Sequence, residues 1–131
     1  MADQFGFRFR DWNIYGDARK FRLVINKILK AYPKIELYGL TDQTKRALNS
    51  ILLNLAEGSN KNSDKETRVY INRAHGSLDE VVACLDCALD DGLIALTHHE
   101  GLLQQASGIA QRLKKFSNYL ESSGKGLRIS D

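Results

Sequence analysis

The stretch that decides the fold runs from residue 38 to residue 94 and reads YGLTDQTKRALNSILLNLAEGSNKNSDKETRVYINRAHGSLDEVVACLDCALDDGLI. Apolar residues recur in it every three or four positions, which is the spacing of an amphipathic helix. Its middle holds the sequence Ser63-Asp64-Lys65-Glu66, which is a capping box. In this motif the serine hydroxyl accepts a hydrogen bond from the Glu66 N–H, and the glutamate carboxylate accepts one from the Ser63 N–H. The stretch therefore predicts two helices, over residues 41–60 and 63–91.

Each predicted helix presents one apolar stripe for burial. In the first helix the stripe is Leu48, Ile51, Leu52 and Leu55, with Thr41 or Asp42 as the expected N-cap. In the second helix it is Tyr70, Ile71, Ala74, Leu78, Val81, Val82, Leu85, Ala88 and Leu89, and Gly92 fits a C-terminal cap.

The second helix also carries another face, on which small residues recur seven positions apart. These are Val69, Gly76 and Ala83, interleaved with Arg73, Glu80 and Cys87. Small residues at this spacing let another helix approach closely. Two interpretations stay open: the helix contacts two neighbours within one bundle, or this face is a subunit contact.

Two more helices flank this block. The first covers residues 14–32, buries Ile14, Ala18, Phe21, Val24, Ile25, Ile28, Leu29 and Tyr32, and is stopped by Pro33. The last opens at a second capping box, Thr97 to Glu100, and buries Leu102, Ala106, Ile109, Ala110, Leu113, Phe116 and Leu120. Short connectors between four such helices predict an all-α, antiparallel up-down-up-down four-helix bundle over residues 14–121, with an N-terminal extension (1–13) and a flexible tail (122–131).

Composition fits one folded domain. The chain has 131 residues, 43% hydrophobic and 27% charged, and no apolar run long enough to cross a bilayer. Its first twelve residues lack the apolar core that a signal peptide has. We therefore expect a cytoplasmic protein without a membrane partner. Charge is segregated: residues 1–73 hold 14 Lys/Arg against 8 Asp/Glu, whereas residues 74–111 hold 6 Asp/Glu and no Lys/Arg. This pattern fits an anionic partner, or basic and acidic surfaces that meet across helices or subunits.

The residues of several segments resemble a bacterial four-helix-bundle protein family that includes proteins encoded within intervening sequences of 23S rRNA genes. The segments are FRDWNIY at 9–15, YGLT at 38–41, NLAEG at 54–58, SDKE at 63–66 and RAHGSLDE at 73–80. The chain departs from the family at Leu52, where a proline is frequent, and at Leu53, where a small polar residue is usual. The resemblance implies a homo-oligomer, a pentamer in particular, and a link to nucleic acid. It implies no enzymatic activity.

Candidate catalytic and metal-binding residues do not form a site. Cys84 and Cys87 have C-x-x-C spacing, but a redox motif sits at a helix N-terminus and a zinc site needs two further ligands. His98 and His99 are adjacent, so they point about 100° apart on a helix, and we interpret them as first-turn surface residues. We expect no enzyme, no metal and no cofactor.

A polar ladder runs along the helix predicted over residues 41–60. We interpret it as a hydrogen-bonded network between helices or subunits, because buried polar groups need partners and no nucleophile is paired with a base. Its candidate members are Arg46, Ser50, Asn54, Glu57, Arg73 and Glu80.

Basic residues supply the candidate nucleic-acid contacts: Arg8, Arg10, Arg19, Lys20, Lys27, Lys30 and Lys34. Near the N-terminus Phe5, Phe7 and Phe9 alternate with arginines, a pattern that suits stacking on single-stranded bases. The alternative is that these rings pack on the bundle and the lysines form a solvated helix face.

These observations predict a homo-oligomeric bundle that binds RNA or DNA through its basic surfaces. The alternative is a protein-interaction scaffold, such as an accessory subunit of a reverse transcriptase or another nucleic-acid enzyme. Leu23 and Leu53 motivate the alternative, because both lie outside the buried stripes.

Overall fold

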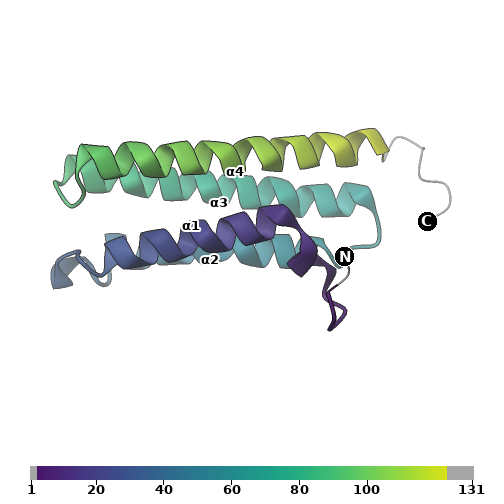
Figure 1. Ribbon diagram of the computed structural model, residues 1–131, viewed down its shortest axis with the longest axis horizontal. Helices are drawn as coiled ribbons and strands as arrows, with labels where there is room; N and C mark the ends of the chain where they lie inside the picture. The colour runs from purple at the N-terminus through teal and green to yellow at the C-terminus, as the bar shows by residue number, and fades with distance from the viewer. Residues whose placement is uncertain (1–2, 124–131) are drawn as a thin grey trace.

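The computed structural model describes residues 3–123, which contain four α-helices, two short 3-10 helices and no strand. The elements are η1 (Arg8–Asp11), α1 (Asn13–Leu29), η2 (Lys34–Glu36), α2 (Leu40–Gly58), α3 (Asp64–Asp90) and α4 (Leu96–Ser123). Figure 1 shows the four helices lying alongside one another, with the colour gradient reversing direction from each helix to the next. Consecutive helices contact each other, and α1 contacts α4, so each helix has two neighbours around one core. The predicted all-α class with four helices is confirmed.

The core takes one stripe from each helix. Its largest fully buried side chains include Phe21, Ile25, Leu48, Ile51, Leu55, Ile71, Leu78, Leu85, Ile109 and Leu113. All of these belong to the predicted stripes, because helical spacing alone decides which side chains point inward. Val24 was predicted to be buried and is 42% exposed, since it is offset by about 100° from Ile25 around the helix axis.

The carboxyl end of α3 forms as predicted, and its amino end forms with one of the two expected capping bonds, because the Glu66 carboxylate accepts from the Ser63 hydroxyl at 3.4 Å in place of the Ser63 N–H. Ser63 is the N-cap, and its hydroxyl accepts a hydrogen bond from the Glu66 N–H at 3.2 Å. At the other end Gly92 has a φ of +73°, a left-handed conformation that glycine adopts without strain. The N–H of Leu93 then donates to the Ala88 carbonyl at 2.8 Å, which is the defining bond of a Schellman cap.

The starts of α2 and α4 differ from the prediction. Gly39 is the N-cap of α2, and the carboxylate of Glu36 accepts from the Leu40 N–H at 3.4 Å, so neither Thr41 nor Asp42 is the cap. The last helix already begins at Leu96, one residue before the predicted cap Thr97. The cap of α2 and the first turn of α4 therefore both lie earlier in the chain than predicted.

The carboxyl end of α1 also differs from the prediction. The α-helix ends at Leu29, and two tight turns follow, in which Ala31 and Tyr32 donate to carbonyls three residues earlier. Pro33 disfavours helical backbone at the preceding residue, which explains the early end. Tyr32 is nevertheless buried, as expected.

Small groups allow α2 and α3 to lie close together. A methyl group added at Gly58 would come within 2.7 Å of the Tyr70 Cβ, and the Gly58 carbonyl accepts from the Thr67 hydroxyl at 3.0 Å. Farther along the same pair, Ser77 donates to Ser50 at 2.8 Å. These contacts fix the relative position of α2 and α3.

Polar and aromatic contacts hold α1 against its neighbours. Arg22 donates to Asn49 on α2 at 2.8 Å, and Arg112 on α4 pairs with Asp17. The Trp12 ring meets Phe116 edge-on at 4.9 Å between centroids. Of the predicted tail, only residues 122 and 123 are described, and they continue α4; the remainder lies outside the described residues.

Candidate functional site

The outward side of α1 is basic. Arg19, Lys27 and Lys30 are exposed and lie along one line of the helix, with Lys20 beside them. Leu23, which is 57% exposed, sits in the middle of this face. We call these five residues the α1 basic face. Its lysines form no ion pair within residues 3–123, and Asp17, the only acid of α1, is paired with Arg112.

The three other predicted basic contacts lie off this face. Lys34 is exposed in η2, beyond the end of α1. Arg8 lies 6.0 Å from the centre of the Trp12 ring, and Arg10 pairs with Asp3 at 3.3 Å while its guanidinium lies 5.7 Å from the Phe5 ring. The seven predicted residues therefore divide between the helix face, η2 and the N-terminal segment.

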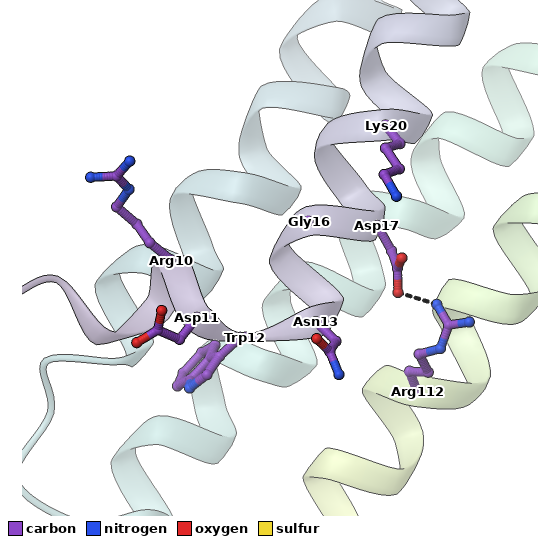
Figure 2. A pocket seen from close by; sticks show the side chains of 8 residues that line it. All are labelled: Arg10, Asp11, Trp12, Asn13, Gly16, Asp17, Lys20 and Arg112. Carbon is purple, nitrogen blue, oxygen red and sulfur yellow. Dashed lines mark hydrogen bonds and ion pairs between the residues drawn. The ribbon is translucent and has the colours of Figure 1, made fainter. Parts of the chain in front are cut away.

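A hollow of about 430 Å³ separates the N-terminal segment from α1 and α4. Figure 2 shows the residues that line it: Arg10, Asp11, Trp12, Asn13, Gly16, Asp17, Lys20 and Arg112. Arg112 reaches across from α4 to Asp17, and Arg10 points away from both. Arg112 is paired and Arg10 is turned outward, so Lys20 is the one cation lining this hollow that forms no ion pair within residues 3–123.

Only part of the polar ladder is joined by hydrogen bonds. The Asn54 amide donates to the Ser50 carbonyl at 2.8 Å and to its hydroxyl at 3.1 Å, and Ser77 donates to the same hydroxyl. Arg46 pairs with Asp42 on its own helix at 3.7 Å. Arg73 lies over Tyr70 instead of joining the ladder.

The two acids of the ladder stay apart from this hydrogen-bonded group. Glu57 and Glu80 are exposed and form no ion pair in the part of the chain that the structure describes. Glu80 lines a shallow pocket together with Arg46 and Tyr38. What remains of the ladder is a small serine–asparagine cluster between α2 and α3.

The second face of α3 is exposed. Val69 is 45% exposed, and Gly76, Ala83 and Cys87 are also exposed. Within residues 3–123 α3 contacts two neighbours, α2 and α4, as the first interpretation expected, but it does so through its other residues, because those of this face stay exposed. The subunit-contact interpretation stays a prediction.

The cysteines occupy two different environments. Cys84 is buried, and burial raises the pKa of its thiol, partly offset by the Thr44 hydroxyl. A raised pKa leaves less of the reactive thiolate at neutral pH. Cys87 is exposed. Within residues 3–123 no three His, Cys, Asp or Glu side chains gather as a metal site.

His99 differs from the prediction. It is buried at 7% exposure, and its Nε2 lies 2.8 Å from an Asp86 oxygen, so it joins α4 to α3. His98 is exposed, as predicted. Helical spacing explains the difference, because His99 lies three residues before the buried Leu102 and therefore on the inward side of the helix.

Sequence reasoning missed several cross-helix partners. Asp17, Asn49, Ser77 and Arg112 connect neighbouring helices, and their partners lie 27 to 95 residues away in the sequence. The ammonium of Lys61, at the end of the predicted polar ladder, lies 4.8 Å from the centre of the Tyr70 ring on α3. Local residue spacing cannot predict hydrogen-bonded partners that lie 27 to 95 residues apart in the sequence.

The fold and surface define a class: a small all-helical protein with four helices around one core and a basic outer face on its first helix. The chain belongs to the family of the 23S rRNA-intervening sequence protein, whose family model matches residues 10–115. This confirms the resemblance. No curated protein matches the chain. None of the helices in residues 3–123 has the length and apolar character needed to cross a membrane.

Proposed function

We propose that this protein is a non-enzymatic nucleic-acid-binding bundle whose α1 basic face contacts phosphates. The observation that carries the proposal is the row of exposed cations along α1: its lysines form no ion pair within residues 3–123, and the Arg19 guanidinium lies 5.9 Å from the centre of the Tyr15 ring. From Arg19 to Lys30 this row spans roughly 16 Å at the usual helix rise, enough for about five phosphate steps of a duplex strand. Membership of the 23S rRNA-intervening sequence protein family supports the proposal of nucleic-acid binding.

A titration tests the proposal. Labelled single-stranded RNA, duplex RNA and duplex DNA are titrated with the protein over a salt series, and the mass of the protein is measured in the same buffers. Phosphate contacts release counterions, so the binding constant falls steeply as salt rises. Binding that is insensitive to salt, or absent at low salt, contradicts the proposal.

The second candidate function is a homo-oligomeric scaffold, in which up-down-up-down bundles associate as the family resemblance implies, a pentamer being the expected size. The exposed α3 face of Val69, Gly76 and Ala83 favours it, because small residues permit close helix contact. The acidic segment 74–111 would then face basic residues of a second copy. Such an assembly also repeats the α1 basic face around the oligomer, so the two functions are compatible.

A further inference from the structure

The N-terminal segment exposes two aromatic rings on an ordered backbone. Phe5 and Phe7 are 64% and 55% exposed. The Asp3 carboxylate accepts hydrogen bonds from the N–H groups of both residues, at 3.0 and 3.1 Å, and holds this segment in a turn. Phe9, in contrast, packs edge-on against Tyr15 at 4.9 Å. Phe7 meets Phe9 edge-on at 6.4 Å between ring centroids, and the Arg10 guanidinium lies 5.7 Å from the centre of the Phe5 ring. Phe5 and Phe7 nevertheless stay more than half exposed, so part of each ring remains available to a partner.

Phe7 forms one wall of an open groove of about 980 Å³ against the carboxyl end of α2. The groove is lined by Gly6, Phe7, Arg8, Phe9, Leu53, Ala56, Glu57, Ser59, Asn60, Lys61 and Asn62. Glu57 is the single acid among these residues, against two cations. The side-chain amides of Asn60 and Asn62 have no hydrogen-bond partner within residues 3–123. The groove thus combines apolar walls, unused amides and positive charge.

Cations and aromatic rings continue beyond the groove. The Lys61 ammonium and the Arg73 guanidinium each lie 4.8 Å from the centre of the Tyr70 ring. Lys61 belongs to both the groove and this cluster. Rings that offer flat faces to bases, next to cations that contact phosphates, are the means by which proteins hold single strands.

We propose that this groove binds the unpaired nucleotides of a single strand. Bases stack on Phe7 in the groove and on Phe5, which precedes the lining residue Gly6, and phosphates contact Arg8 and Lys61. This inference rests on the proposed function, because it names the form of nucleic acid that the protein holds. A duplex cannot use the two rings in this way, since its base faces are already stacked. The two rings precede residue 10, where the match to the family model begins, whereas the α2 wall of the groove lies within the match.

An apolar helix or peptide fits the groove less well. It would remove the Asn60 and Asn62 amides and the Lys61 ammonium from water without replacing their hydrogen bonds. Nucleotides bring phosphates for the cations and base edges for the amides.

The experiment compares the wild-type protein with a Phe5→Leu/Phe7→Leu variant, which keeps apolar bulk and loses both aromatic faces. The probes are a twelve-nucleotide oligouridylate, an oligothymidylate of the same length and a duplex. The control is Tyr38→Leu, which removes a ring that is 92% exposed in the connector beyond the far end of α1. We expect the variant to bind the single strands at least about tenfold more weakly, with duplex binding and salt dependence unchanged. The RNA and DNA arms identify which strand is preferred.

Crosslinking of a 5-iodouridine oligonucleotide to wild-type protein gives a second readout that needs no variant. Crosslinks within residues 3–9 or 53–62 support the site, and crosslinks found only elsewhere overturn it. Equal binding of single strands and duplex by both proteins overturns the inference and leaves the proposed function intact. Failure of wild-type protein to bind any probe overturns both. If the double variant has a lower oligomeric mass than the wild type, a second copy of the chain occupies the groove, and the inference is overturned.

Discussion

Single residues set how closely the helices can approach. Gly58 leaves room for the Tyr70 Cβ, which would lie only 2.7 Å from an added methyl group. We expect Gly58→Ala to destabilise the protein by about 1–3 kcal/mol, the usual cost of overpacking a well-packed site. Urea unfolding followed by circular dichroism measures this loss.

Gly108→Ala is the matched control for this substitution. Gly108 also lies in a helix, but an added methyl group meets nothing within 4 Å. Alanine there should stabilise the protein by up to about 1 kcal/mol through helix propensity. Equal effects of the two substitutions would show that Tyr70 does not restrict position 58.

Buried ionisable groups predict how stability depends on pH. Burial raises the pKa of both Tyr32 and Cys84 above their ordinary values. Both groups therefore stay protonated in the folded protein at a pH where the unfolded chain begins to ionise. Their contribution is fully present below the pKa values of the unfolded chain and is lost as pH rises through those of the folded protein.

We expect the free energy of unfolding to fall above about pH 9. Tyr32→Phe removes one of these ionisations and keeps the ring, so its stability should fall less steeply. Chemical unfolding between pH 7 and 11 gives both slopes. Parallel curves for the variant and the wild type would rule out Tyr32 as a source of the alkaline loss.

At the scale of the element, the position of a helix end can depend on one side chain. The Ser63 hydroxyl caps α3 by accepting from the Glu66 N–H. Ser63→Ala should therefore cost about 1 kcal/mol, the typical value of a lost N-cap. Thermal unfolding reports it, with Ser107→Ala on the exposed side of α4 as control. A control that loses as much stability would point to a general effect of serine removal.

The same elements show what the sequence could predict. The stripes placed the core residues, because burial follows from spacing alone, and the Ser63 and Gly92 caps followed from motifs within a few residues of each other. The start of α2 depends on Glu36, four residues before Leu40 in the preceding 3-10 helix, rather than on Thr41 or Asp42. The contact between His99 and Asp86 joins α4 to α3. Partners of this second kind depend on tertiary contacts, which local patterns do not contain.

The candidate site was predicted less completely than the fold. The lysines of α1 were recognisable because a helix with one apolar side must expose the other. The groove was not, because it joins residues 6–9 to residues 53–62 across the bundle. Neither segment alone carries a pattern that indicates a groove.

At the scale of the whole molecule, the proposed function predicts that the charge of the α1 basic face governs nucleic-acid binding. Lys27→Gln/Lys30→Gln removes two phosphate contacts from α1, so the slope of log affinity against log salt should become shallower by roughly 1.4 to 1.8. Lys114→Gln/Lys115→Gln, with the same net charge and exposed α4 positions, should change it little. If both pairs shift the slope equally, only net charge matters and α1 is not the contact.

Assembly is tested on the exposed face of α3. Ala83→Arg places a long charged side chain where close helix contact is proposed, and we expect a smaller oligomeric mass by light scattering. Ser107→Arg on α4 controls for the added charge. An unchanged mass in Ala83→Arg would place the subunit contact elsewhere.

The helices differ in length, with 17 and 19 residues in α1 and α2 against 27 and 28 in α3 and α4. In Figure 1 the amino end of α3 and the carboxyl end of α4 therefore extend beyond the shorter pair. Polar bonds join this projection, among them the Arg68–Glu121 ion pair at 2.7 Å and the Ser117–Asn72 bond at 2.8 Å. Segments with less apolar burial open more readily than the core. The backbone amides of this projection should therefore exchange with deuterium through a local opening that leaves the rest of the bundle closed. Salt should make that opening easier, because it screens the Arg68–Glu121 ion pair.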